Sequence, residues 1–406
     1  MENEFIQLEG GLDTVEGFFT LGVHCGIKKV NNDLAIIFAD TPAAAAAVFT
    51  TNRVCAAPVE VTRQNLKKNG HFQLVVINSG VANACTGQRG LEDAITMSEI
   101  AAREFGLSDP SLVAVASTGV IGDFLPLDKI EFGIKKVKEF YPQTHSSRET
   151  ARAIMTTDTF MKERAISFQL YGQEVHLAGI AKGSGMIRPN MATMLGFLLT
   201  DAAVYPDSLQ KALKTAVDVS FNRVTVDGDT STNDMVLLMA NGKCGKTRID
   251  ENHPDFPRFQ AALTFVCQEL AKDIARDGEG ATKFINIMVR GAQSENDART
   301  IAFTVAESPL VKTAFFGQDP NWGRIMAAIG RSGIAVIPDK IYISINDNPF
   351  VEDGMGTKKM TRNELQSVIQ NKDLEIVIEL NQGNAEFNVW TCDLSFDYVK
   401  INSHYS

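Results

Sequence analysis

The chain is organised around one stretch near its middle, Ala181-Lys182-Gly183-Ser184-Gly185-Met186-Ile187-Arg188-Pro189-Asn190-Met191-Ala192-Thr193-Met194-Leu195-Gly196. Glycine gives its first part the backbone freedom of a loop, and proline interrupts regular secondary structure there. From Met194 the sequence becomes an apolar run that is typical of a buried strand. The preceding residues 165–181 predict a β-hairpin that turns at Tyr171-Gly172. Thr193 therefore stands where a loop enters a core strand, which is a rigid position for a reactive group.

Three interpretations of this loop compete: a phosphate-binding loop of either of two types, a plain connector, and self-cleavage. A dinucleotide-binding loop is excluded because Gly183-Ser184-Gly185 is followed by Arg188-Pro189 and no third glycine opens a helix. A P-loop is excluded because Lys182 precedes the glycines and no Gly-Lys-Ser or Gly-Lys-Thr follows them. A plain connector between two halves remains, but connectors are usually polar and seldom run straight into a core strand.

The third interpretation is self-cleavage of the Ala192–Thr193 bond. A threonine hydroxyl is a weak nucleophile until a base takes its proton. Cleavage just before Thr193 releases an α-amino group, whose reference pKa of about 8 suits that task. The hydroxyl would first attack the Ala192 carbonyl to give an ester that water resolves. No histidine is needed, and the sequence has no Gly-x-Ser-x-Gly motif, so a Ser-His-Asp hydrolase is disfavoured.

The rest of the chain predicts an α/β or α+β fold of several domains. Its 406 residues are 44% hydrophobic and 22% charged, as in ordinary globular proteins. Strand patterns alternate with helical ones. We expect strands at 34–38, 72–77, 113–116 and 284–289 and near 341, 374 and 387, and helices at 91–105, 127–140, 146–155, 208–219 (capped by Asp207 and Ser208), 259–274 and from 296.

Composition excludes several classes of function. The net charge of −10 argues against binding to a nucleic-acid backbone. No apolar run approaches the roughly 20 residues that span a bilayer, and the acidic N-terminus has no signal-peptide pattern, so we expect a cytoplasmic protein. The six cysteines show no C-x-x-C pair, which predicts free thiols and no metal site. The acidic loop 227–234 lacks the glycine and glutamate of a calcium loop, so we interpret it as a tight polar loop near the site.

Three further polar segments are candidates for chemistry. Ser117-Thr118-Gly119 ends a strand, where backbone N–H groups beside a hydroxyl can stabilise an oxyanion, although most such turns only reverse the chain. Thr156-Thr157-Asp158-Thr159 follows a helix and is interpreted as a cap in preference to a ligand-facing rim. Glu279, between two glycines, should be exposed or ligand-facing unless another group pairs it.

Together, several of these segments resemble the ornithine acetyltransferase family of arginine biosynthesis. The resemblance rests on Lys182-Gly183-Ser184-Gly185-Met186-Ile187, Ala192-Thr193-Met194-Leu195, and residues 117–119, 156–159, 227–234 and 317–324, which span nearly the whole chain in order. It implies a self-cleaving enzyme that moves an acetyl group from N-acetylornithine to glutamate through an acetyl-threonine. Acetyl-CoA is a second donor in some members, and no other cofactor and no metal is implied.

The resemblance also implies a fold and an assembly. The fold is an αββα sandwich like that of the N-terminal-nucleophile hydrolases, with a smaller α/β C-terminal domain. The expected divisions are residues 1–192 (the α chain), 193–282 (the start of the β chain) and 283–406. The cleaved chains are expected to form an α2β2 heterotetramer.

By position, Thr193 matches the family's nucleophile, and Thr118 and Gly119 match its oxyanion hole. The substrate-binding positions match Thr156, Lys182, Thr193, Glu279, Asn402 and Ser406. Lys182 suits an amino-acid carboxylate, and Glu279 suits an ammonium group. Two alternatives remain open: an aminopeptidase or amidase of the N-terminal-nucleophile type, with water as acceptor, and a non-catalytic amino-acid-binding protein that stays uncut.

Overall fold

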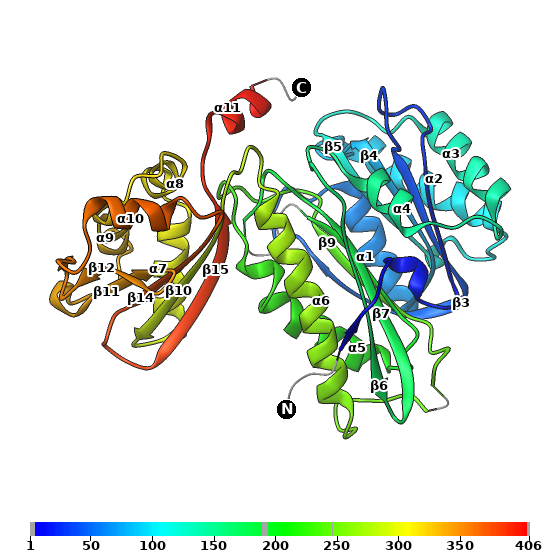
Figure 1. Cartoon of the computed structure of the whole chain (residues 1–406). Helices are drawn as coiled ribbons and strands as arrows, with labels where there is room; N and C mark the ends of the chain where they lie inside the picture. Colours follow the sequence, from blue (N-terminus) through cyan, green and yellow to red (C-terminus); the bar gives the residue numbers. More distant parts are fainter. Residues whose placement is uncertain (1–4, 189–193, 246, 404–406) are drawn as a thin grey trace. The chain divides into compact units, whose positions relative to one another are not determined.

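The structure is a computed structural model that describes residues 5–188, 194–245 and 247–403. It divides into two compact units (Figure 1). The first comprises Met1–Asn222 and Asp229–Ala271, and the second comprises Arg223–Gly228 and Lys272–Ser406. Both units combine sheets with helices, so the predicted mixed α/β class is confirmed. The division at residues 192 and 282 stays a prediction.

The first unit is built on one nine-stranded sheet, as far as the described residues go. The strand order is β1-β6-β7-β8-β9-β3-β4-β5, and β2 pairs with β3. The strands are β1 (Ile6–Gln7), β2 (Phe18–Val23), β3 (Leu34–Phe49), β4 (His71–Val81), β5 (Val113–Val120), β6 (Lys162–Leu170), β7 (Gln173–Lys182), β8 (Leu195–Thr200) and β9 (Met235–Ala240).

The long strand β3 divides this sheet into two halves. Its first part, Leu34–Phe38, pairs with β2 and β4, and its last part, Ala44–Phe49, pairs with β9. The register with β4 shifts between the two parts. One buried cluster combines alternate side chains from both halves, such as Ile37 and Val75 with Phe197 and Leu237. The two halves therefore face each other across a shared core.

Helices cover the outer faces of the two halves. On one face, side chains of α2 (Gly87–Phe105) and α3 (Leu127–Phe140) form a second core with Ile36 and Val76. On the other, α6 (Phe256–Arg276) packs so closely on β7 that a Cβ at Gly179 would lie 2.9 Å from Leu270. The expected α–β–β–α layering is confirmed, with one bent sheet supplying both β layers. The remaining helices of this unit are α1 (Ala57–Asn69), α4 (Ser147–Ile154), α5 (Pro206–Asp218), η1 (Leu12–Thr14), η2 (Pro110–Leu112) and η3 (Phe221–Arg223).

Most helix limits agree with the sequence, with one correction. Helix α2 ends as predicted at Gly106, whose φ of 73° is the left-handed conformation that glycine adopts easily. The expected cap of α5 by Asp207 and Ser208 is wrong. The helix begins at Pro206, ahead of both residues, and proline has no N–H to leave unpaired at a first helical position.

The second unit holds a six-stranded sheet among the described residues. Its order is β13-β12-β11-β14-β10-β15, in which β10 and β14 are parallel and the other pairs are antiparallel. Its own apolar core joins the sheet to the helices. The elements are β10 (Phe284–Ala292), α7 (Glu295–Ala306), α8 (Pro309–Phe316), α9 (Trp322–Gly330), η4 (Pro338–Lys340), β11 (Tyr342–Ile345), β12 (Asn348–Glu352), β13 (Met355–Gly356), α10 (Arg362–Ile369), β14 (Asp373–Glu379), β15 (Ala385–Cys392) and α11 (Phe396–Asn402).

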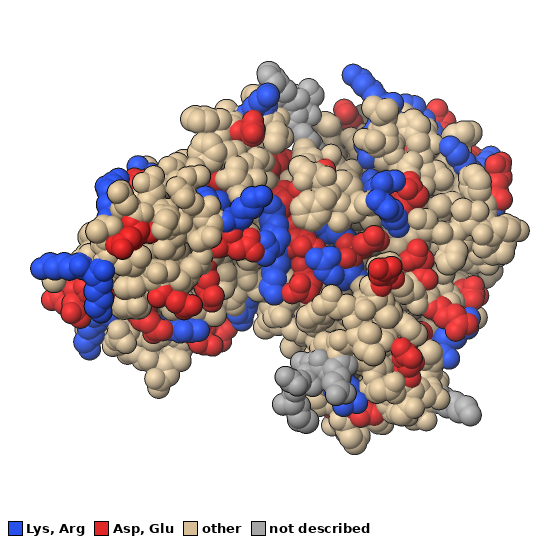
Figure 2. Space-filling model, viewed as in Figure 1, with Lys and Arg blue, Asp and Glu red and all other residues tan. Residues whose placement is uncertain are grey.

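Two features concern nucleic-acid binding and membrane insertion: the charge of the surface and the length and polarity of the helices. On the face seen in Figure 2, acidic side chains lie among basic ones. Within the three described ranges, no helix is long and apolar enough to cross a membrane.

Candidate active site

A small pocket in the first unit gathers residues from four segments of the chain. Its lining residues are Thr118 near the end of β5, Lys182 at the end of β7, Met194 and Leu195 at the start of β8, and Ser231, Asn233 and Asp234 in the loop before β9. Sheet register explains part of this convergence. Lys182 on β7 lies opposite Leu195 on β8, and Leu195 lies beside Met235 on β9. The loop 229–234 therefore ends next to the lysine, as we interpreted it from the sequence.

Asn233 connects this loop to the facing half of the sheet. Its Nδ2 donates to the carbonyl oxygens of Ala82 (2.6 Å), directly after β4, and Ser117 (2.9 Å), within β5. Asn233 is buried, so both hydrogen bonds are shielded from water. This amide holds the acidic loop against the Ser117-Thr118-Gly119 segment.

Thr118 and Gly119 lie at a close approach of two strands. The Lys182 ammonium donates to Thr118 Oγ1 at 3.3 Å. Gly119 has φ = 134°, and a Cβ there would lie 2.2 Å from the carbonyl carbon of Gly80 on β4. Only glycine fits both the conformation and the space. The glycine next to Thr118 is thus required by the fold itself.

Asp234 is a buried carboxyl group that the sequence did not single out within its loop. Its Oδ1 accepts the N–H of Met194 at 2.9 Å, and its Oδ2 has no hydrogen-bond partner among the described residues. Burial raises the pKa of Asp234 well above its usual value, against the opposing effects of the Met194 N–H and the Lys182 charge. Asp234 therefore binds the backbone amide of the residue that directly follows Thr193.

Residues 156–159, which we interpreted as a helix cap, make a local hydrogen bond after α4 and also connect distant segments through Asp158. Asp158 has a fully buried side chain that accepts three hydrogen bonds, from Lys162 Nζ (2.7 Å), the Gly183 N–H (2.7 Å) and the Thr156 N–H (3.0 Å). Burial alone would raise the pKa of Asp158, but the charges of Lys162 and Lys182 outweigh it and hold the pKa far below its usual value. The segment therefore joins the end of α4 to the loop after β7, and Thr156 lines a second pocket.

Glu279 and Asn402 meet in the second unit. Glu279 is buried in spite of its flanking glycines, and its Oε2 accepts the Asn402 Nδ2 at 2.6 Å. Both residues are among the substrate-binding positions expected from the sequence. Glu279 was expected to be exposed or ligand-facing unless another group paired with it, and Asn402 is such a group. Ala192, Thr193 and Ser406 lie outside the described residues.

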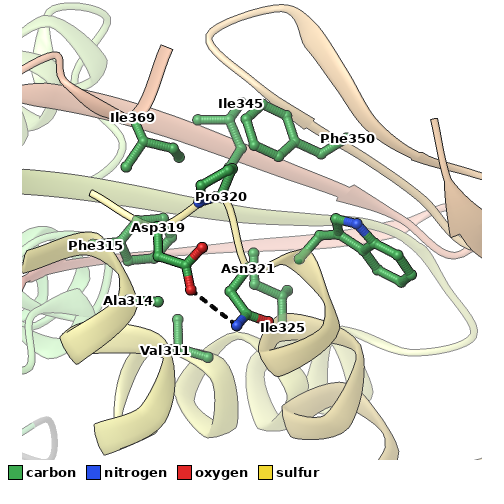
Figure 3. Close-up of a pocket in the computed structure, with 11 residues that line it drawn as sticks. Val311, Ala314, Phe315, Asp319, Pro320, Asn321, Ile325, Ile345, Phe350 and Ile369 are labelled. Carbon is green, nitrogen blue, oxygen red and sulfur yellow. Dashed lines mark hydrogen bonds between the residues drawn. The ribbon is translucent and has the colours of Figure 1, made fainter. Parts of the chain in front are cut away.

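The loop 317–324, which contributed to the resemblance, closes a small apolar pocket in the same unit (Figure 3). Asp319 at its rim accepts from Asn321 Nδ2 (3.1 Å) and pairs with Arg362 (3.0 Å). Asp319 thus binds one residue of its own loop and one on α10, which indicates a structural role for this motif. Across the described residues, no three His, Cys, Asp or Glu side chains gather as metal ligands would, and all six cysteines are unpaired.

Comparison with known proteins identifies the family. The profile of the ArgJ family matches residues 20–406. The "Arginine biosynthesis bifunctional protein ArgJ" of Bacillus subtilis (strain 168) is 45% identical over 404 residues, covering 100% of this chain and 98% of that protein. The protein of the same name from Streptococcus mutans is 47% identical over 398 residues, covering 98% and 99%.

Among solved structures, the ornithine acetyltransferase of Mycobacterium tuberculosis complexed with ornithine is 38% identical, with a TM-score of 0.42. The match covers 46% of this chain and 98% of that one. The extent of the profile match and the full-length identity to the curated relatives lead to one conclusion: this chain belongs to the ArgJ family.

Proposed function

We propose that this protein is a self-cleaving acetyltransferase of arginine biosynthesis that moves an acetyl group from N2-acetylornithine to glutamate. Its family and the names of its curated relatives support the pathway. The ornithine-bound relative supports the substrate class. The observation that carries the proposal is the pocket where Thr118, Lys182 and Asp234 meet beside Met194, the residue after the expected nucleophile.

In this mechanism the chain first cuts itself between Ala192 and Thr193. The Thr193 hydroxyl then attacks the acetyl carbonyl of N2-acetylornithine, and the new α-amino group takes the hydroxyl proton. Thr118 and Gly119 stabilise the oxyanion, where one donor contributes about 3 kcal/mol to lowering the barrier. The amide C–N bond breaks, ornithine leaves with the proton, and Thr193 keeps the acetyl group as an ester.

Glutamate completes the cycle by a ping-pong sequence. Its neutral α-amino group attacks the ester carbonyl, and the Thr193 oxygen leaves and regains a proton. Both amino acids carry an α-carboxylate, so Lys182 can bind that group in each. Glu279 suits the side-chain ammonium of the donor, and Thr156, Asn402 and Ser406 complete the substrate-binding set.

The remaining expectations belong to the same proposal. Acetyl-CoA serves as a second acetyl donor to glutamate, in keeping with the word bifunctional in the relatives' name. The protein works in the cytoplasm, without a metal or a resident cofactor, as an α2β2 assembly of its cleaved chains.

One experiment tests the proposal directly. Purified protein is incubated with glutamate and either N2-acetylornithine or acetyl-CoA, and N-acetylglutamate is measured in each case. We expect product with N2-acetylornithine, two bands on a denaturing gel, and neither with Thr193→Ala. Release of acetate from N2-acetylornithine without glutamate would instead indicate an amidase, and a single intact band without turnover would indicate an amino-acid-binding protein.

A further inference from the structure

A second pocket of the first unit has no assigned role. It is open to solvent, and its wall includes Lys28, Asn32, Glu149, Arg152, Met155 and Thr156. Thr156 is one of the expected substrate-binding positions. Lys28 comes from the loop between β2 and β3, which no motif in the sequence singled out.

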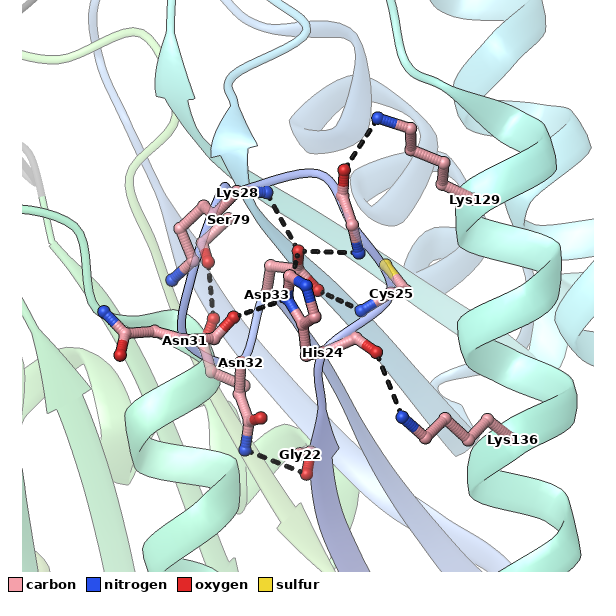
Figure 4. A network of polar contacts seen from close by, with 12 residues as sticks. Gly22, His24, Cys25, Lys28, Asn31, Asn32, Asp33, Ser79, Lys129 and Lys136 are labelled. Carbon is pink, nitrogen blue, oxygen red and sulfur yellow. Dashed lines mark hydrogen bonds and ion pairs between the residues drawn. The ribbon is translucent and has the colours of Figure 1, made fainter.

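The loop that carries Lys28 is held by one buried carboxylate, Asp33 (Figure 4). Asp33 accepts the backbone N–H groups of Cys25 (2.6 Å), Gly26 (3.1 Å) and Lys28 (2.9 Å), and His24 Nδ1 lies 3.2 Å away. Three backbone hydrogen bonds to one carboxylate fix the turn. The backbone position of Lys28 is therefore set before any ligand arrives.

The two cationic side chains of this pocket, Arg152 and Lys28, differ in their partners. Arg152 pairs with Glu149 at 2.7 Å, and Glu149 also accepts the Asn32 Nδ2 at 2.7 Å. The Lys28 ammonium donates to the Met155 carbonyl oxygen at 3.1 Å and forms no ion pair with any described residue. An ammonium has three donors, so Lys28 keeps capacity for an anion. Burial lowers the pKa of Lys28, which indicates that its charge is partly withdrawn from water.

This pocket adjoins the candidate active site. Asp158, which also lines it, accepts the N–H of Gly183, directly after Lys182. Burial lowers the pKa of Lys28, the carboxylates of Asp33 and Asp158 oppose this effect, and the charge of Lys182 lowers the pKa further. Lys28 contacts Met155 and Lys182 directly precedes Gly183, so the segment 155–158 links the two cations, which together match a ligand with two carboxylates.

Glutamate has two carboxylates, whereas N2-acetylornithine has one and carries an ammonium on its side chain. We propose that Lys28 binds the side-chain carboxylate of the glutamate acceptor while Lys182 binds its α-carboxylate. This inference rests on the proposed function and adds a residue that distinguishes the acceptor from the donor. The donor's side chain makes no use of Lys28, because two ammonium groups repel each other.

The test compares Lys28→Met, which keeps a side chain of similar length without the charge, with Lys29→Met at the exposed neighbouring position. For Lys28→Met we expect the KM for glutamate to rise about 10- to 100-fold, the range of one charged hydrogen bond. The KM for N2-acetylornithine should stay within about twofold, because that substrate does not use the charge. Lys29→Met should match the wild type, and Lys28→Arg should recover most of the glutamate affinity.

Two measurements test the role of Lys28 independently of the proposed acetyltransferase activity. The first half-reaction, ornithine release with acetyl-enzyme formation in the absence of glutamate, should proceed normally in Lys28→Met and also shows that the variant is folded. The preference for glutamate over glutamine as acceptor should shrink in the same variant. An unchanged KM for glutamate, or equal rises in both KM values, would overturn the role of Lys28. Absence of transfer in the wild type would overturn the proposed function instead.

Discussion

At the scale of single residues, Asp234 and Asp158 are two buried carboxyl groups with opposite electrostatic environments. Asp158 accepts three hydrogen bonds and pairs with a lysine, so it is held as an anion. Asp234 accepts the Met194 N–H, and its other oxygen lacks a partner among the described residues, so burial favours its neutral form. A neutral acid keeps one oxygen as an acceptor for Met194 without placing a full charge in the buried site.

Asp234 should make stability depend on pH in a direction opposite to that of most carboxyl groups. Its pKa is raised on folding from 3.8, so its stabilising effect is full below that pH and is lost as pH rises through the folded-state value. We expect the wild-type free energy of unfolding to fall with increasing pH relative to Asp234→Asn, by up to about 1.4 kcal/mol per pH unit. Urea titrations between pH 4 and 8, with Thr193→Ala in both proteins, measure this difference.

The matched control for Asp234 is Asp123→Asn, at an exposed carboxyl group. At each pH the free energy of unfolding of this variant should stay within about 0.5 kcal/mol of that of the wild type, as for most surface substitutions. A flat difference for Asp234→Asn as well would show that Asp234 is ionised in the folded protein.

The buried pair Lys162–Asp158 should contribute far more to stability than a surface pair of the same spacing. Lys162→Met leaves a carboxylate buried without its cation, which costs about 3–5 kcal/mol. The double variant Lys162→Met/Asp158→Asn should recover part of that loss, because the uncompensated charge is gone. Lys214→Met breaks the exposed i,i+4 pair with Asp218 and should change the free energy of unfolding little. Equal effects of the two lysine substitutions in urea unfolding would contradict this interpretation.

At the scale of elements, local patterns predicted most helices and strands. Helix α3 was predicted at its observed limits, and the hairpin β6–β7 turns at Tyr171-Gly172, where φ is 42° and 75°. Strand β3 was predicted only as residues 34–38 and continues to Phe49. Its second part is a run of alanines of low strand propensity, and their strand conformation follows from pairing with β9 and burial, which are long-range effects.

The candidate site shows the same limit of sequence reasoning. Motifs indicated the segments that hold Thr118, Lys182 and the acidic loop, and the structure brings these segments together. The contacts of Asp158 with Gly183 and of Asp234 with Met194 could not be predicted, because they depend on how distant parts of the chain come together. Lys28 carries no local signal at all. The role of Thr193 as nucleophile stays a prediction.

Helix α4 supplies Glu149 and Arg152 to the wall of the second pocket and packs against Gly22 of β2. A substitution at Gly22 tests this packing. A Cβ at this position would lie 2.0 Å from the carbonyl oxygen of Glu149 and 2.8 Å from the Ala153 side chain. Gly22→Ala must therefore push α4 away, and we expect a loss of at least about 1–3 kcal/mol, the usual cost of overpacking. Because Glu149 would move with α4, the KM for glutamate should also change.

Gly330→Ala is the control for this substitution. That glycine ends α9, and no atom lies within 4 Å of the Cβ it would gain. Alanine is the better helix former, so thermal unfolding should be unchanged or occur at a slightly higher temperature. A Gly22→Ala protein as stable as the wild type would show that α4 is not fixed against β2.

At the scale of the whole molecule, the proposed cut at Ala192–Thr193 would divide one sheet between two chains. Strand β7 precedes the cut and β8 follows it, yet they pair from Leu177–Thr200 to Lys182–Leu195. Strand β9, from the second chain, pairs with β3 from the first. The cleaved chains should therefore remain bound through two strand pairings and a common apolar core.

That core makes dissociation without unfolding unfavourable. The inner cluster joins Ile37 and Ile180 from before the cut with Phe197 and Leu237 from after it, and separating the chains would expose all of them to water. We expect wild-type protein to show two bands on a denaturing gel, residues 1–192 and 193–406, but one peak in size-exclusion chromatography that contains both. Thr193→Ala should elute at the same volume as a single band. The chains should separate only at denaturant concentrations that also remove the circular dichroism signal of the sheet, and separation under native conditions would show that the first unit does not hold its two halves together.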